Sequence, residues 1–171
     1  MMGARYGVLI LEGNWGEDYA TYLTDSRSTS RLYTALEDLL SLKQPLKFIQ
    51  RPLLNSRFVQ DIQNFITLTE NQEGGTVIIL SAHGERIETD DGRTRKRVLN
   101  ALDGSLNLSL QIKGVRDLGR TILILDSCEV GEGLKSFQKI AKALAVVGFG
   151  KSVNWIDSTL FVLALLDKLN Q

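Results

Sequence analysis

Three short apolar runs, none with the polar alternation of a half-exposed strand, constrain the fold of this 171-residue chain most strongly. They read YGVLIL (residues 6–11), TVIIL (76–80) and TILIL (121–125). A strand that is apolar on both faces must be buried on both faces, which is typical of a parallel sheet covered by helices. LKFIQ (46–50) and LAVVGF (144–149) predict two further strands.

Segments with helical apolar spacing alternate with these strands. They predict helices over residues 30–42, from Asn55 to about residue 66, from just after Gly131, and from about Trp155 to Leu169. The alternation predicts an α/β fold, a three-layer α/β/α sandwich with a mostly parallel central sheet. We expect residues 1–171 to form a single domain of this kind.

The stretch from Glu85 to Gly119 breaks the alternation. It contains TDDGRTRKR (89–97), a turn signal inside a charged run, which predicts a protruding hairpin or loop. The charged 85–97 part is more often a solvated hairpin than a lid or docking surface. SLNLSLQI (105–112) alternates like a strand but could equally open a helix, and both possibilities remain open.

Charge and cysteine content exclude several classes of protein. Twenty basic and twenty acidic side chains cancel, so no global charge attracts nucleic acid or an anionic membrane. A single cysteine cannot form an internal disulfide, which fits a reducing cytosol. The apolar part of the N-terminus is too short for a signal peptide, and the run at 160–166 is too short to span a bilayer. We therefore expect a soluble, cytoplasmic protein.

Two of the apolar strands end on residues that carry chemistry. TILILDSCEVG (121–131) contains the only cysteine, Cys128, and VIILSAHGER (77–86) contains the only histidine, His83. Ligands of an open parallel sheet bind beyond the carboxyl ends of its strands, so these side chains share one edge if their strands are neighbours. A lone cysteine is usually a small core residue and a lone histidine a surface group. Their joint placement favours a thiol–imidazole site instead.

Neighbouring groups could activate this thiol. A nearby imidazole or a helix N-terminus lowers the pKa of a thiol, and we expect the helix after Gly131 to direct its first amides at the sulfur. The amide of Gly84 could hold an oxyanion, because a carbonyl approaches a residue without a Cβ closely. One histidine and one cysteine do not supply the ligands of a zinc site, and Asp90 and Asp91 are too few for calcium. No metal and no cofactor is expected.

Together, VIILSAHGER and ILILDSCEVG resemble the caspase-like fold of cysteine peptidases, which includes caspases, metacaspases and prokaryotic CHAT-type proteases. His83 precedes Cys128 by 45 residues, against about 50 in the caspase signature. Asp two residues before Cys and Gly three residues after it are closer to the metacaspase form. The final VVGFGKSVNWIDSTLFVLALLDKL is similar to the end of short bacterial CHAT-like domains.

This resemblance implies a cysteine endopeptidase that acts on a protein or peptide substrate, in a regulated prokaryotic signalling or defence system. Cys128 would be the nucleophile and His83 the general acid/base. The backbone amides of Gly84 and Cys128 would form the oxyanion hole.

Substrate preference is harder to predict. Asp126 matches the metacaspase acid that reads Arg or Lys before the scissile bond, although it could also be a cap. Arg27 lies roughly where caspases place an arginine that reads Asp, although it could simply pair with Asp25. Ser127 is expected to contact the substrate as well. The balance weakly favours basic substrates.

Three alternatives remain open. Caspases continue with further strands that complete the pocket, so here the pocket is shallow or is completed by a partner chain or a second copy. The chain could be a catalytically silent scaffold or switch protein. Gly131 and Gly133 between a strand and a helix also allow a nucleotide-binding domain, although the glycine-rich motif is absent at the first strand, where it belongs.

Overall fold

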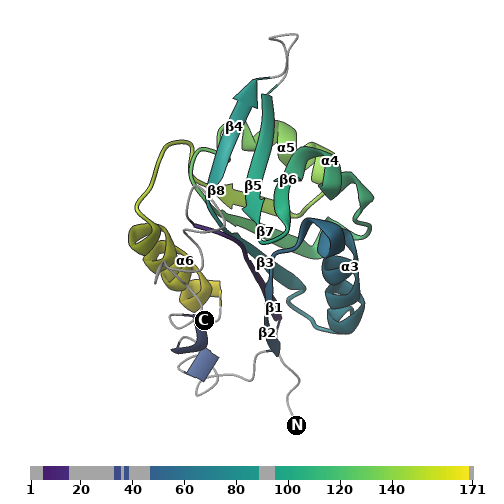
Figure 1. Cartoon of the computed structure of the whole chain (residues 1–171). Helices are drawn as coiled ribbons and strands as arrows, with labels where there is room; N and C mark the ends of the chain where they lie inside the picture. The colour runs from purple at the N-terminus through teal and green to yellow at the C-terminus, as the bar shows by residue number, and fades with distance from the viewer. Residues whose placement is uncertain (1–5, 16–32, 36, 39–46, 89–94, 170–171) are drawn as a thin grey trace.

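The computed structural model describes residues 6–15, 33–35, 37–38, 47–88 and 95–169, and these contain a five-stranded sheet (Figure 1). The strand order is β2-β1-β3-β7-β8, and each neighbouring pair is parallel. The strands are β1 (Gly7–Glu12), β2 (Lys47–Pro52), β3 (Thr76–Ser81), β7 (Thr121–Asp126) and β8 (Ala145–Gly148). All five predicted strands are confirmed, as is their parallel arrangement.

Helices cover both faces of this sheet, as the continuous apolar strands require. α3 (Phe58–Thr69) and α5 (Leu134–Ala141) lie on one side of the strands in Figure 1, and α6 (Trp155–Leu169) lies on the other. Each face buries its own apolar cluster. Phe58, Ile62 and Phe137 belong to the first cluster, and Tyr33, Val162 and Leu166 to the second. The predicted three-layer α/β/α architecture is therefore confirmed.

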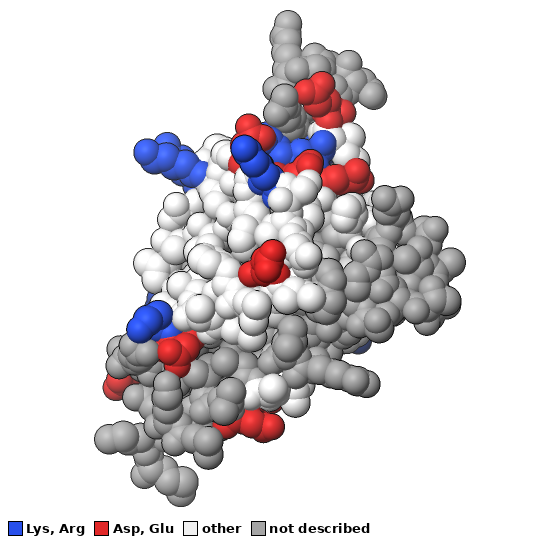
Figure 2. Space-filling view, turned by 90° about the vertical axis from the view of Figure 1, so that its left-hand side faces the viewer, with Lys and Arg blue, Asp and Glu red and all other residues white. Residues whose placement is uncertain are grey.

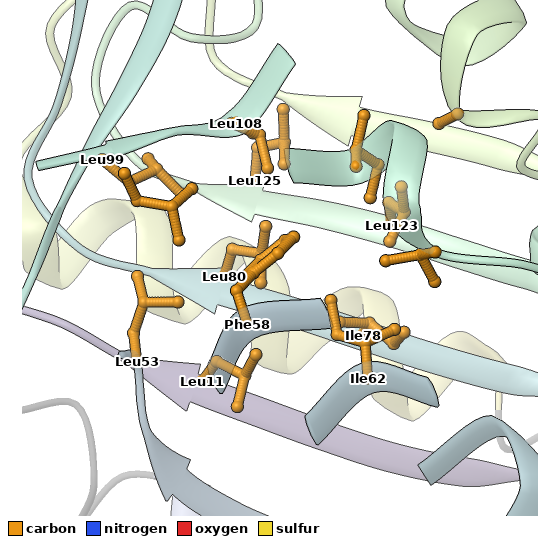
Figure 3. Close-up of a cluster of buried hydrophobic side chains, with 14 of the residues drawn as sticks. Leu11, Leu53, Phe58, Ile62, Ile78, Leu80, Leu99, Leu108, Leu123 and Leu125 are labelled. Atoms are coloured by element: carbon orange, nitrogen blue, oxygen red, sulfur yellow. The ribbon is translucent and has the colours of Figure 1, made fainter. Parts of the chain in front are cut away.

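The segment that broke the alternation forms a second, antiparallel sheet. β4 (Gly84–Glu88) pairs with β5 (Arg95–Ala101), which pairs with β6 (Gly104–Asn107). The predicted hairpin is thus confirmed, but the segment is more than a solvated loop. Leu99, Leu106 and Leu108 are fully buried in the first cluster, where Figure 3 shows Leu99 and Leu108 among the side chains of the large sheet.

The ambiguous stretch at 105–112 adopts both of the expected structures in turn. It continues β6 as far as Asn107 and then forms the short helix α4 (Leu108–Gln111), with the Asn107 side chain accepting a hydrogen bond from the Leu110 amide. Two 3₁₀ turns, Ile112–Gly114 and Leu118–Arg120, lead into β7. The alternating pattern thus corresponds to the strand, and the cap residue Asn107 to the change from strand to helix.

The helix expected from Asn55 begins slightly later than predicted. Asn55–Arg57 forms a 3₁₀ turn before α3, and the Asn55 side chain does not cap it. Instead Asp103, from the turn between β5 and β6, accepts hydrogen bonds from the Asn55 and Ser56 amides at 2.5 and 3.0 Å. Of the helix predicted over residues 30–42, residues 33–35 and 37–38 are described, and they are helical.

Within the described residues, no helix has both the length and the apolar character needed to cross a bilayer.

Candidate active site

The register of β3 and β7 places His83 and Cys128 at equivalent positions beyond the carboxyl edge of the sheet. Ser81 pairs with Asp126 at the last step of the two parallel strands. His83 and Cys128 each follow two residues beyond that pair, so the only imidazole and the only thiol leave neighbouring strands at equivalent positions. The condition set by the sequence, that the two strands be neighbours, is met.

The backbone of His83 is fixed by two other segments. Its N–H donates to the carbonyl of Asn14 at 2.7 Å, and its carbonyl accepts from the N–H of Asn100 at 2.9 Å. The N–H of Asn14 in turn donates to the carbonyl of Asn100 at 2.7 Å. The ends of β1, β3 and β5 therefore meet at His83, whose side chain is half-buried. This role of Asn14 was not predicted from the sequence. Its position just after the first apolar strand was the one feature of the sequence that could have indicated it.

Gly84 lies directly against the turn that carries Cys128. A Cβ at Gly84 would be 2.6 Å from Ser127 Oγ and 2.8 Å from Val130 Cγ1, closer than real Cβ atoms come to neighbours, and 3.0 Å from the carbonyl oxygen of Cys128. Only glycine permits this approach without displacing the turn. Gly84, one of the two residues expected at the oxyanion hole, therefore packs closely against the turn that carries the other, Cys128.

Ser127 is enclosed rather than open to a substrate. It is fully buried, and its hydroxyl donates to the carbonyl of Ala82 at 2.6 Å. The substrate contact expected for it from the sequence is not available in this arrangement. Its hydroxyl joins the loop after β3 to the loop after β7.

The thiol of Cys128 contacts the segment that precedes α6. Its Sγ lies 3.3 Å from the carbonyl oxygen and 3.5 Å from the amide nitrogen of Val153, and the side chain is half-buried. The sulfur can therefore donate to the carbonyl as a thiol or accept from the N–H as a thiolate. Within the described residues no hydrogen bond joins the thiol to His83. Catalytic hydrogen bonds are often long before a substrate binds.

The expected helix N-terminus is not at the sulfur. The chain forms turns after Cys128, and α5 begins only at Leu134, behind Gly133. The amides in between have other acceptors: Glu129 donates to Lys151, and Gly131 donates to Phe149 at 2.8 Å. The Val130 amide donates to the carbonyl of Cys128 itself at 2.6 Å.

The amide of Cys128 differs from those that follow it. No acceptor for it is found within the part of the chain that the structure describes. It therefore remains a candidate oxyanion donor. The occupied amide of Gly131, in contrast, removes the phosphate cradle that a nucleotide-binding loop would need.

Arg97 lies on β5 and belongs to the charged run noted in the sequence. Its side chain supports the turn that follows Cys128. Its Nε donates to the carbonyl of Val130 at 2.8 Å, and its Nη2 donates to the carbonyl of Glu132. The guanidinium lies 5.0 Å from the ring centroid of Phe137, and the residue is buried. Burial, together with the positive charge of Arg86, lowers the pKa of Arg97 from its ordinary value. Nothing in the sequence distinguished Arg97 from Arg93 or Arg95.

Asp126 lies beneath the site rather than in an open pocket. It is fully buried, and its Oδ2 accepts hydrogen bonds from the hydroxyls of Tyr33 and Ser81, each at 2.9 Å. Burial raises the pKa of Asp126, an effect that hydrogen bonds from Ser158, Tyr33 and Ser81 oppose and the charge of Glu12 reinforces. This carboxyl group is therefore not exposed to a substrate side chain in this arrangement. Arg27, the other specificity candidate, lies outside the described residues.

An open cavity of about 730 Å³ is lined by Glu129 and Ser152, the chain neighbours of Cys128 and Val153. Its walls come from β4, from the turn after Cys128, and from the segment before Val153. The lining residues are Arg86, Glu88, Glu129, Glu132, Gly150, Lys151 and Ser152. In Figure 2, acidic and basic side chains gather at the upper end of the molecule, at the height of β4 in Figure 1. Among the described residues no group of three or more metal-ligating side chains occurs.

Neither a protein-family model nor a curated protein matches this sequence. Among solved structures, the chain is similar to caspase-1 from Spodoptera frugiperda, with a TM-score of 0.41 and 16% identity over 74% of this chain and 48% of that one. It is also similar to a protein from Geobacter sulfurreducens, with a TM-score of 0.43 and 13% identity over 95% of this chain and 65% of that one. The chain thus spans less than two thirds of each of these structures. The chemistry proposed below rests on the site geometry and not on these scores.

Proposed function

We propose that this chain is a cysteine endopeptidase in which Cys128 is the nucleophile and His83 the general acid/base. One observation carries the proposal: the only thiol and the only imidazole follow a paired register position on adjacent parallel strands. The close approach of Gly84 to the turn that carries Cys128 supports it, because it brings the two residues expected at the oxyanion hole near one another. A structural cysteine and a surface histidine have no need of this arrangement.

The reaction follows from these roles. The Cys128 thiolate attacks the carbonyl carbon of the scissile peptide bond, and the amides of Gly84 and Cys128 hold the oxyanion. The imidazolium of His83 then gives its proton to the leaving amine as the C–N bond breaks, which leaves a thioester. His83 takes a proton from water, whose oxygen attacks the thioester and releases the carboxylic acid and the thiolate. The Val153 N–H, at 3.5 Å, is a ready donor to that thiolate.

Cleavage after Arg or Lys, in a regulated prokaryotic signalling or defence system, belongs to the same proposal. Its support is the resemblance of the two strand-end motifs to caspase-like peptidases. A protein substrate is favoured over a small molecule because the cavity beside Cys128 is open and polar rather than enclosed and apolar.

A catalytically silent scaffold is the second candidate, and one observation favours it. The thiol is hydrogen bonded to Val153 and not to His83 in this structure. If that arrangement persisted with substrate, the imidazole could not activate the sulfur.

Hydrolysis and alkylation decide between the two candidates. The first assay uses fluorogenic peptides that differ only in the residue before the cut (Arg, Lys, Gln or Asp), with wild type, Cys128→Ala and His83→Gln. The second measures the rate at which iodoacetamide modifies Cys128 at neutral pH, unambiguous because no other cysteine exists. An enzyme cleaves peptides, loses cleavage in both variants, and shows His83-dependent alkylation. A scaffold shows no cleavage and an alkylation rate that His83→Gln leaves unchanged.

A further inference from the structure

We propose that the cavity beside Cys128 binds a basic side chain of the substrate and that Glu129, rather than Asp126, is the carboxylate that recognises it. This inference rests on the proposed peptidase function, because it assigns a specificity residue to that site. It differs from the expectation drawn from the sequence, in which Asp126 reads the substrate.

The residues that line the cavity include the chain neighbours of the thiol and of the residue that contacts it. Glu129 is bonded to Cys128 in the chain and lines the cavity, as does Ser152. Ser152 precedes Val153, whose carbonyl and amide contact the sulfur. A substrate chain whose carbonyl is at Cys128 therefore has this cavity within reach of a neighbouring side chain.

The backbone conformation holds Glu129 at the cavity. Its φ is 57°, in the left-handed region that non-glycine residues seldom adopt, and its N–H donates to the carbonyl of Lys151 at 3.3 Å. Its Oε1 accepts a hydrogen bond from the Ser152 hydroxyl at 3.0 Å, while the residue as a whole is exposed. The side chain is thus held by a neutral donor and remains open to solvent.

No ion pair of Glu129 is found among the described residues, although Lys151 also lines the cavity. Three acidic and two basic side chains line the cavity. Arg86 pairs with Glu132, and the nearby Arg97 also donates to the backbone of Glu132. The described partner of the Glu129 carboxylate is the uncharged Ser152. A guanidinium or ammonium group from a substrate would give this carboxylate a charged partner, with charge-assisted hydrogen bonds.

Asp126 is a poorer candidate for this role. It is fully buried and already accepts from Tyr33 and Ser81, and burial raises its pKa away from the charged form. The cavity at Glu129 is open, and its volume lies within the range of roughly 300–1,000 Å³ typical of ligand sites.

Binding measured without catalysis tests the assignment. The Cys128→Ala protein would be titrated, by fluorescence anisotropy, with two labelled peptides that differ only in Arg or its neutral isostere citrulline before the intended cut. We expect the Arg peptide to bind on the order of tenfold more tightly, as charge-assisted hydrogen bonds predict. Adding Glu129→Gln should abolish that preference. Adding Glu85→Gln, an exposed acid of β4 that does not line the cavity, should preserve it.

The outcomes separate this inference from the proposed function. Preference for Arg that survives Glu129→Gln but is lost in Asp126→Asn overturns the inference and returns the role to Asp126. Equal binding of the two peptides, or binding of neither, also overturns it. Glu129-dependent binding by Cys128→Ala, combined with no hydrolysis by wild type, would refute the peptidase while supporting a binding site for basic segments.

Discussion

The hydroxyl of Ser127 donates a 2.6 Å hydrogen bond to the carbonyl of Ala82, joining the residue before Cys128 to the residue before His83. Both residues are fully buried. The spacing of the two loops is therefore fixed by groups that take no part in the chemistry. Exchange of either His83 or Cys128 should leave this link intact, which makes their variants clean tests of the site.

Gly84→Ala is expected to destabilise the fold and impair Cys128 together. The new methyl group would lie 2.6 Å from Ser127 Oγ and 2.8 Å from Val130 Cγ1. Relief of that overlap requires the turn after Cys128 to shift, and overpacking of this kind costs about 1–3 kcal/mol. Urea unfolding and the rate of iodoacetamide modification would measure the two effects.

A matched glycine provides the control. A Cβ at Gly119 meets no atom within 4 Å, so Gly119→Ala should change neither measurement. If Gly84→Ala were as stable and as reactive as Gly119→Ala, the close contact at the candidate oxyanion hole would be refuted.

Arg97→Met is expected to cut peptide hydrolysis by tenfold to a hundredfold, roughly the effect of a small misplacement of a catalytic group. Arg97 donates to the carbonyls of Val130 and Glu132 and so holds the turn that carries the nucleophile. Loss of these buried hydrogen bonds should also cost about 1–3 kcal/mol in unfolding free energy. Lys96→Met, at the exposed neighbouring position on β5, serves as the control. Unchanged kcat/KM in Arg97→Met would show that the turn keeps its shape without this support.

The sequence predicted the sheet, and the edge of the sheet that precedes His83 and Cys128, because those depend on local patterns. Apolar runs without alternation identify buried parallel strands, and the residues that follow them must lie at the carboxyl edge. His83 and Cys128 were singled out in this way, and the pairing of Ser81 with Asp126 shows that the strands preceding them are neighbours.

The parts that the sequence did not predict depend on contacts between distant segments. Tyr33 lies 93 residues from Asp126 in the sequence, yet its hydroxyl donates a hydrogen bond to that carboxylate. Arg97 reaches a turn 33 residues further along the chain, and no spacing distinguishes it from the other arginines of its charged run. The sequence alone therefore could not show that Asp126 is buried, or that Arg97 holds the turn after Cys128.

Asp126→Asn is expected to remove one component of the pH dependence of stability. Because burial raises the folded pKa of Asp126, this group's contribution is fully present below its ordinary value of 3.8 and is lost as pH rises through the higher folded pKa. The unfolding free energy of wild type, relative to Asp126→Asn, should therefore fall as pH rises through that window. Urea unfolding between pH 4 and pH 8 would measure the difference, in which other titrating groups cancel. A difference that is constant with pH would contradict the raised pKa.

Tyr33→Phe is expected to destabilise the protein more at neutral pH than at acid pH. The Tyr33 hydroxyl donates to Asp126 at 2.9 Å and favours the ionised carboxylate, so its loss raises the pKa of Asp126 further. The cost, about 1–3 kcal/mol for a buried charged acceptor left short of a donor, should shrink as Asp126 becomes protonated.

Tyr6→Phe is the matched control for that variant. The Tyr6 hydroxyl is also buried, but it donates to the carbonyl of Leu166 at 3.1 Å, an acceptor that does not titrate. Its loss should therefore cost the same at every pH at which the protein folds. Parallel pH profiles for the two variants would mean that Tyr33 acts on Asp126 only through packing. A profile that slopes for Tyr33→Phe alone would establish that the Tyr33 hydroxyl favours the ionised form of Asp126.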